Sequence, residues 1–234
     1  MACPRDPSLS DFEDTLGDSW NRAKGGNPAD VRKQSGIYRY IKSCIAKVEA
    51  EITFVDLGPN LGSLNRAVLT SCDYFLAPVS PDLFSIRGTE NLGKKLLLWR
   101  KEWDQIRQAS PEDAELPPGK PMFLGYVTQQ HTLRNNEAGM TAGWQIFGAR
   151  VEGAVQKNIV QRLKPLDQVI AWDDNSYDLG KIPNLHSLIP YSQEARKPIF
   201  DCTAQDGLRG AHIAKARDSK ALFEGMAQIL INRL

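Results

Sequence analysis

Asp56 is the residue whose type and position point most clearly to chemistry. It follows residues 52–55, Ile-Thr-Phe-Val, a short apolar run that predicts a strand buried on both faces within a parallel sheet. Open α/β sheets bind their ligands at the carboxyl ends of such strands. A carboxylate placed there can hold the Mg²⁺ ion that accompanies nucleotide phosphates. We therefore predict a metal-binding acid at Asp56.

The residues after Asp56 predict the elements that would position it. A turn reading Leu-Gly-Pro-Asn-Leu-Gly comes first, and the sequence then predicts a helix over 63–71, a strand over 74–78 and a long helix over 84–108. Helices and strands that alternate in this way predict parallel strands joined by right-handed crossovers. The expected fold class is α/β, a mostly parallel sheet flanked by helices. A further strand is expected at 122–128. Further helices are expected at 141–163 and 214–234, and an earlier one at 29–49.

The usual companion of such an acid is a phosphate-binding loop of the form G-x-x-x-x-G-K-[ST], and none occurs in the 234 residues. Lys24-Gly25-Gly26 matches only the opening of a related loop. A phosphate cradle needs a strand before it and a Lys-Ser/Thr pair that opens a helix after it. Here a polar segment precedes Lys24 and Asn27-Pro28 follows Gly26. We interpret 24–26 as a loop before a helix that starts after Pro28.

Several stretches of the chain resemble the ParA/MinD (Soj-like) partition ATPases, and especially a longer ParA-like subgroup. They are the DLGPNLG turn at 56–62, the small-residue helix at 63–71, the strand ending at Pro78, the segment PDLFS at 81–85 with Gly88, Asn91 and Leu92, Gly125-Tyr126-Val127, and EARKPIF at 194–200. The resemblance covers most of the chain from about Leu9 onward. It implies a P-loop NTPase-like fold of the SIMIBI/ParA type, here incomplete at its N-terminal side.

The resemblance also implies a function. Relatives bind ATP and Mg²⁺, dimerise, bind DNA nonspecifically and position plasmids, chromosomes or other cargo. By this resemblance Asp56 would hold the metal through water, the turn with Gly58, Pro59 and Gly62 would respond to the γ-phosphate, and Gln129 and Pro198 would contact the adenine. The family more often has Asn at the position of Gln129.

Other interpretations of these residues need no ligand. Asp56 can cap the following helix or pair with Arg66, and the two glycines can simply supply positive φ in a turn. The basic side chains on the 84–108 helix can face DNA or only solvent, and we name Lys94, Lys95, Arg100 and Lys101 as candidates. The three histidines are scattered and lack the spacing of metal ligands.

The missing P-loop portion has a structural consequence. In a P-loop sheet the P-loop strand lies beside the acid-bearing strand, so without it the backbone of 52–55 would be unpaired and its side chains exposed. The chain could be truncated, completed by another polypeptide, or rearranged with its chemistry lost. We expect a single domain over 1–234, with 1–28 partly flexible, and no ATP hydrolysis by the chain alone. The alternative is a non-catalytic module that docks on a full-length ParA-like partner.

Composition bounds the remaining choices. Hydrophobic residues make up 41% and charged residues 24%, which suits a globular domain with a core, and 29 basic against 28 acidic residues give no overall attraction to DNA. The four cysteines have no CxxC spacing and predict reduced thiols. No apolar run approaches the ~18 residues of a membrane span. We expect a cytoplasmic protein without membrane contact, acting as a homo-oligomer or with a ParA-like or ParB-like partner.

Overall fold

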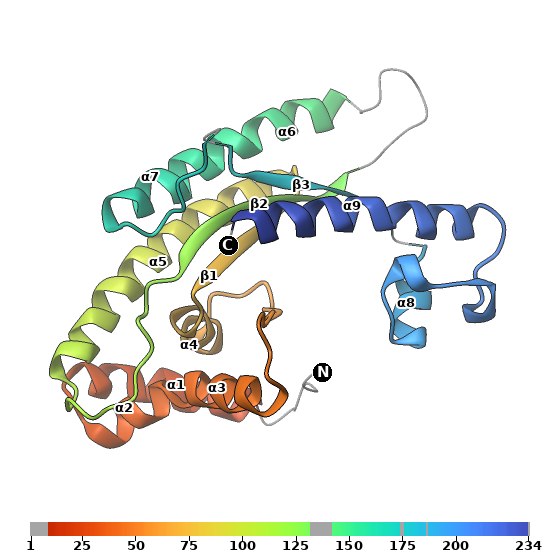
Figure 1. The fold of residues 1–234 in the computed structure, drawn as a ribbon. Coiled ribbons are helices and arrows are strands. Elements are labelled where there is room, and N and C mark those ends of the chain that lie inside the picture. Colours follow the sequence, from red (N-terminus) through yellow and green to blue (C-terminus); the bar gives the residue numbers. More distant parts are fainter. Residues whose placement is uncertain (1–8, 132–141, 174–175, 186, 234) are drawn as a thin grey trace. The chain divides into compact units, whose positions relative to one another are not determined.

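The computed structural model describes residues 9–131, 142–173, 176–185 and 187–233 (Figure 1). The elements of the first half are α1 (Leu9–Lys24), α2 (Pro28–Gln34), α3 (Gly36–Val48), α4 (Ser63–Ser71), β1 (Tyr74–Val79), α5 (Leu83–Ala109) and β2 (Met122–His131). Those of the second half are α6 (Ala142–Val155), the π-helical turn η1 (Gln156–Val160), α7 (Gln161–Leu163), η2 (Lys164–Leu166), β3 (Asp178–Pro183), α8 (Ile189–Ala195), η3 (Ile199–Asp201), η4 (Ala204–Asp206) and α9 (Ala211–Arg233).

The described residues form one three-stranded sheet in the order β1-β2-β3, with helices against it. β2 pairs with β3 in parallel, with Tyr126 opposite Asp178 and Thr128 opposite Lys181. The α/β class and the parallel sheet predicted from the sequence are confirmed. Among the described residues, no helix has the length and apolar character needed to cross a membrane.

The chain divides into two compact units, each built from discontinuous segments. The first contains Met1–Phe75, Glu90–Leu124 and Asn158–Ile170, and the second contains Leu76–Thr89, Gly125–Lys157 and Ala171–Leu234. The single domain expected over 1–234 stays a prediction. Of the segment 1–28 expected to be partly flexible, residues 9–24 form α1, and residues 1–8 lie outside the described part.

The core of the first unit is built around two tryptophans. Trp20 from α1 and Trp103 from α5 stack with ring centroids 6.0 Å apart, and Ala23, Val31 and Ile106 complete the cluster. Aromatic pairs of this kind add stability beyond the area they bury. Leu96, Trp99, Trp103 and Ile106 on the second half of α5 are all buried, so one side of this helix belongs to the core.

Asp82 starts α5. Its carboxylate accepts a hydrogen bond from the Ser85 backbone N–H at 2.8 Å and another from the Ser85 hydroxyl at 3.1 Å. An acid at this position satisfies backbone donors of the first turn and interacts favourably with the helix dipole. The Pro-Asp-Leu-Phe-Ser segment therefore has a structural role at the beginning of α5.

The second unit packs α9 on β3 and on the short helices before it. Leu185, Leu188, Cys202, Leu208 and Ala216 form its buried cluster. Gly180 in β3 has a φ of +136° and faces Met226 of α9, so a side chain at this position would be strained and crowded. Leu222 of α9 lies outside this core and is 41% exposed.

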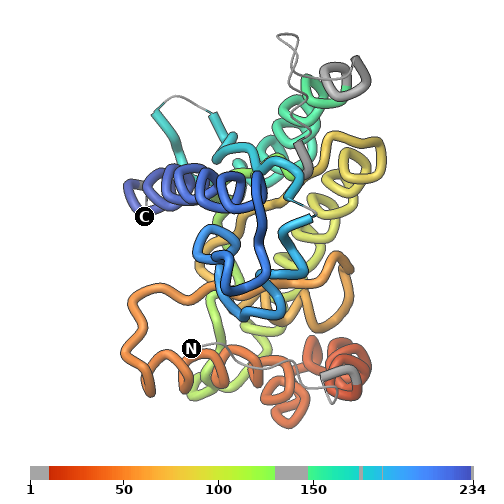
Figure 2. Tube along the Cα trace, turned by 90° about the vertical axis from the view of Figure 1, so that its right-hand side faces the viewer, coloured from red at the N-terminus to blue at the C-terminus, as the bar shows by residue number. Residues whose placement is uncertain are grey.

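The structure corrects two sequence predictions in the first unit. The helix expected over 29–49 is two helices, because Ser35 interrupts it between α2 and α3. The strand expected at 52–55 is absent: these residues form coil between α3 and α4, which Figure 2 follows as an open orange loop. Apolar pattern alone does not make a strand, since a strand also needs a neighbour to pair with.

Candidate functional site

Asp56 does not lie at the end of a strand, contrary to the prediction. The apolar run before it is exposed to solvent, with Ile52 at 53%, Phe54 at 80% and Val55 at 39% exposure. Asp56 is itself exposed. The structure thus shows the exposed side chains expected of a segment that lacks a neighbouring strand. It does not show the strand that the sequence predicts there.

The turn over 58–62 is held by one buried amide. The side-chain Nδ2 of Asn65, in the first turn of α4, donates to the carbonyl oxygens of Gly58 at 2.7 Å and Asn60 at 2.6 Å. The Asn60 side chain in turn accepts from the Gly62 backbone N–H at 3.1 Å. Such a network fixes the course of a loop that has no ladder of its own. The side chains of Asn65 and Asn60 therefore hold the turn in place without a bound ligand.

A carboxylate of the chain occupies the beginning of α4. Gly62 is the N-cap residue and offers no side chain to the helix. Glu13 from α1 approaches instead: its Oε1 accepts from the Leu64 backbone N–H at 3.4 Å and lies directly against the Cα of Gly62, where a Cβ would overlap it. A negative charge is favourable at a helix N-terminus. Glu13 and Gly62 thus form one contact between α1 and the turn.

Arg66 packs on the tryptophan core. Its guanidinium lies 3.7 Å from the centroid of the Trp20 ring, a cation–π contact, and its Nη2 donates to the Leu16 carbonyl at 3.3 Å. Burial lowers the pKa of Arg66 to about 10, and the nearby charge of Glu102 acts in the opposite direction. The structure therefore gives Arg66 a structural role beside Trp20.

Glu102 links α5 to α1. Its two oxygens accept from Trp20 Nε1 at 2.7 Å and from Lys24 Nζ at 2.8 Å. Burial alone would raise the pKa of Glu102, but the two hydrogen bonds and the charges of Lys24 and Arg66 together hold it below its usual value. The carboxylate is therefore most stabilising when it is ionised.

Lys24-Gly25-Gly26 is the end of α1. The backbone N–H groups of Gly25 and Gly26 donate to the carbonyls of Arg22 at 3.1 Å and Ala23 at 2.9 Å, so they are engaged in ending the helix. The Lys24 ammonium is paired with Glu102, and Asn27 caps α2 at Ala29 and Asp30. The interpretation of 24–26 as a loop before a helix is confirmed.

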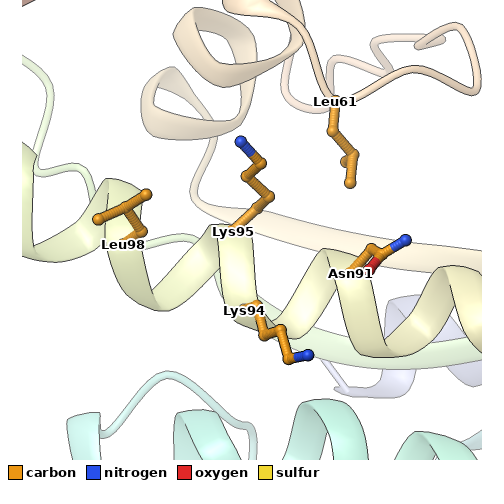
Figure 3. Close-up of a pocket in the computed structure, with 5 residues that line it drawn as sticks. All are labelled: Leu61, Asn91, Lys94, Lys95 and Leu98. Carbon is orange, nitrogen blue, oxygen red and sulfur yellow. The ribbon is translucent and has the colours of Figure 1, made fainter.

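A pocket of about 310 Å³ lies within the first unit between the 58–62 turn and α5. Leu61 contributes one wall, and Asn91, Lys94, Lys95 and Leu98 contribute the other. Figure 3 shows Lys95 directed to the same side of α5 as Leu61, whereas Lys94 extends to the opposite side. The pocket therefore brings one predicted basic residue, Lys95, next to the predicted nucleotide turn.

The four candidate basic residues of α5 differ in their surroundings. Lys94 pairs with Glu90 at 2.6 Å, and Arg100 pairs with Asp104. Lys95 and Lys101 are exposed, and neither shows an ion pair within the described part of the chain. Two of the four charges are thus already compensated, which weakens the basic face proposed for DNA.

Gln129 and Pro198 belong to the second unit, whereas Asp56 and the turn belong to the first. Gln129 is half-buried near the carboxyl end of β2. Pro198 is exposed and caps η3, where its carbonyl accepts from the Asp201 backbone N–H at 3.0 Å. Their predicted contact with an adenine stays a prediction.

Among the described residues, no three His, Cys, Asp or Glu side chains come together in a way that could hold a metal ion. Cys44, Cys72 and Cys202 are free thiols. Burial raises the pKa of Cys72 to about 11, so its unreactive thiol form dominates at neutral pH. The side chains of His131 and His186 lie outside the described part of the structure. His212 belongs to no group of potential metal ligands among the described residues.

Sequence reasoning missed Asn65, Glu13 and Glu102 as residues that position the site. The one available signal was Asn65, a polar residue on the small-residue helix directly after the turn. Side chains at such positions commonly bond to nearby backbone. Nothing in the sequence linked Glu13 or Glu102 to the turn or to Trp20, because those contacts join segments tens of residues apart.

Comparison with known proteins gives a fold likeness only. No family model and no curated protein matches the chain. A crystal structure of the protein DIP2308 from Corynebacterium diphtheriae is similar, with a TM-score of 0.60 and 25% sequence identity. The match covers 79% of this chain and 60% of that chain, so this chain spans about three-fifths of its neighbour's length.

Proposed function

We propose that this chain is a ParA-like ATPase-family protein that takes part in partitioning DNA or positioning cargo, and that its ATP pocket is completed by a P-loop from elsewhere. The observation that carries the proposal is the turn at 56–62, held by Asn65 and preceded by exposed apolar residues. A segment of this kind is expected where a neighbouring strand is missing. The order of α4, β1 and the Asp82-capped α5 after this turn also suits the family.

The residues have the following roles in this proposal. Asp56 would orient Mg²⁺ through water, and the turn with Gly58, Pro59 and Gly62 would respond to the γ-phosphate. Gln129 and Pro198 would contact the adenine. Mg²⁺ and a P-loop lysine supply the electrostatic stabilisation of the transferring phosphate. Because the 234 residues contain no such lysine motif, we expect no turnover by this chain alone.

The completing polypeptide in this proposal is a ParA-like protein that carries a P-loop, because a second copy of these 234 residues has no such motif. A homo-oligomer or a ParB-like protein is the other proposed assembly. Exposed side chains at Ile52, Phe54 and Val55 would be covered in such an assembly. Binding to DNA would be nonspecific and would depend on salt. We also propose a cytoplasmic location.

Thermal unfolding with and without Mg²⁺ and ATP tests the proposal. A ligand that binds only the folded state raises its stability by about 2.7 kcal/mol at a hundredfold excess over Kd. For a chain of this length that corresponds to a rise of roughly 5–10 °C in Tm. We expect a Mg²⁺-dependent rise for the wild type and a smaller one for Asp56→Asn. A Tm that ATP leaves unchanged would reject the nucleotide site.

The second candidate is a non-catalytic module that docks on a full-length ParA-like protein. The exposure of 52–55 favours it, and so does α3, in which no residue is buried. In this case ATP would leave the Tm of the chain unchanged, while the ParA-like protein would raise it. The same thermal measurement therefore separates the two candidates.

A further inference from the structure

We infer that the pocket between the 58–62 turn and α5 binds a phosphate group of a small molecule, with Lys95 as its cation. All five residues that line this pocket belong to this chain, so the site does not require a P-loop from elsewhere. Lys95, which the sequence suggested as a DNA contact, would thus bind a small molecule instead.

The pocket has the make-up of a small ligand site. Its volume of about 310 Å³ lies at the lower end of the range for small-molecule pockets. Leu61 and Leu98 provide apolar walls, and Asn91 and Lys95 provide polar groups. None of the five lining residues is acidic. The lining residues therefore offer donors to an anion and no carboxylate.

Charge compensation singles out Lys95. Its neighbour Lys94 also lines the pocket, but Lys94 points to the other side of α5 and pairs with Glu90 at 2.6 Å. Lys95 has no carboxylate partner among the residues that the structure describes. The exposed Lys95 ammonium is therefore the cation of this pocket that can pair with an anion through a charge-assisted hydrogen bond.

The donor set favours phosphate. The Asn91 amide and the Lys95 ammonium stand one turn of α5 apart on the helix, at positions i and i+4, and so share a face. A phosphate has three acceptor oxygens and can accept from both groups at once, with a charge-assisted bond from Lys95. The same chemistry would come from a nucleotide, an inorganic polyphosphate or the DNA backbone, and a parallel titration with duplex DNA separates the small molecules from DNA.

Calorimetric titration with tripolyphosphate in the presence of EDTA tests the inference. Lys95→Gln should weaken binding by about three- to tenfold, the loss of one partly exposed charge-assisted contact. Lys101→Gln is the matched control, since it removes one exposed lysine charge from the same helix outside the pocket, and it should leave binding unchanged. Leu61→Glu, which places a carboxylate in the pocket without changing Lys95, should weaken binding as well.

Three results would overturn the inference: no binding by the wild-type chain, an equal loss in both lysine variants, or a loss confined to a duplex DNA titrated in parallel. EDTA removes Mg²⁺ and so separates this site from the Mg²⁺-dependent ATP site proposed at Asp56. Binding of tripolyphosphate together with an ATP-induced rise in Tm that does not depend on Mg²⁺ would support the Lys95 pocket and reject the Mg²⁺-dependent ATP site.

Discussion

Two glycines on α5 allow a sharp test of how the first unit is packed. Gly93 is buried and lies directly against the backbone carbonyl oxygen of Asn158, with the carbonyl carbon 3.0 Å and the Arg162 side chain 3.2 Å from the position a Cβ would take. Gly88, less than two turns earlier on the same helix, is exposed with no atom within 4 Å of that position. Replacing each glycine with alanine isolates the contact.

The two substitutions should have opposite effects on stability. Alanine is favoured over glycine in a helix by up to ~1 kcal/mol, and Gly88→Ala should gain this amount. Gly93→Ala gains the same amount but forces a backbone carbonyl to move, and overpacking typically costs about 1–3 kcal/mol. Because the obstacle is backbone and not a flexible side chain, we expect the upper end of that range. The two variants should therefore differ by about 2–3 kcal/mol.

Urea unfolding followed by circular dichroism and tryptophan fluorescence measures this difference. The corresponding gap in Tm is roughly 5–10 °C for a chain of this size. Equal stabilities of the two variants would show that α5 does not lie against the π-helical turn at Gln156–Val160, and the account of the first unit would then fail.

Three further substitutions test contacts around the turn. Asn65→Ala should cost about 1–2 kcal/mol in urea unfolding, because the carbonyls of the 58–62 turn lose their buried donor; an unchanged free energy would mean that the turn is held otherwise. The pKa of Glu102 is lowered in the folded state from its ordinary value of 4.5, so the carboxylate stabilises the fold fully above pH 4.5 and loses this effect as the pH falls through the folded pKa. Glu102→Gln should therefore reduce the loss of stability at acid pH when unfolding is measured as a function of pH. An identical pH profile for the two proteins would contradict the contact. Gly62→Ala should displace the carboxylate of Glu13 and cost up to about 1 kcal/mol, and a double-mutant cycle with Glu13→Ala should show that the cost disappears; additive effects would refute the contact.

The sequence predicted elements well where local pattern decides the outcome. The helix at 63–71 and the strand that starts at Tyr74 occur as expected, because the first has helical periodicity and the second an apolar run between turn residues. The α5 helix extends one residue beyond the prediction at each end. Lys24-Gly25-Gly26 was interpreted correctly from its flanks.

The sequence failed where a partner element decides the outcome. Residues 52–55 have the composition of a strand but form coil, since strand formation depends on a neighbour and not on apolar pattern alone. The sequence predicts plain helix at Gln156–Val160, where the structure has a π-helical turn, and Asn158 of this turn lies against Gly93.

Site geometry was the least predictable part. Lys94 and Lys95 are adjacent in sequence and equivalent by type, yet one pairs with Glu90 and the other lines the pocket. Consecutive helical positions point about 100° apart, so only the packed structure shows which of them faces Leu61. The contacts of Glu13 and Glu102 join distant segments and leave no local trace.

Hydrogen exchange at residues 52–55 tests the central proposal most directly. If this segment awaits a strand and P-loop from another polypeptide, its backbone amides should exchange rapidly in the chain alone. They should become protected when a ParA-like ATPase that carries the P-loop motif is added with Mg²⁺ and ATP. Protection already present in the chain alone, or none gained in the mixture, would contradict the proposal.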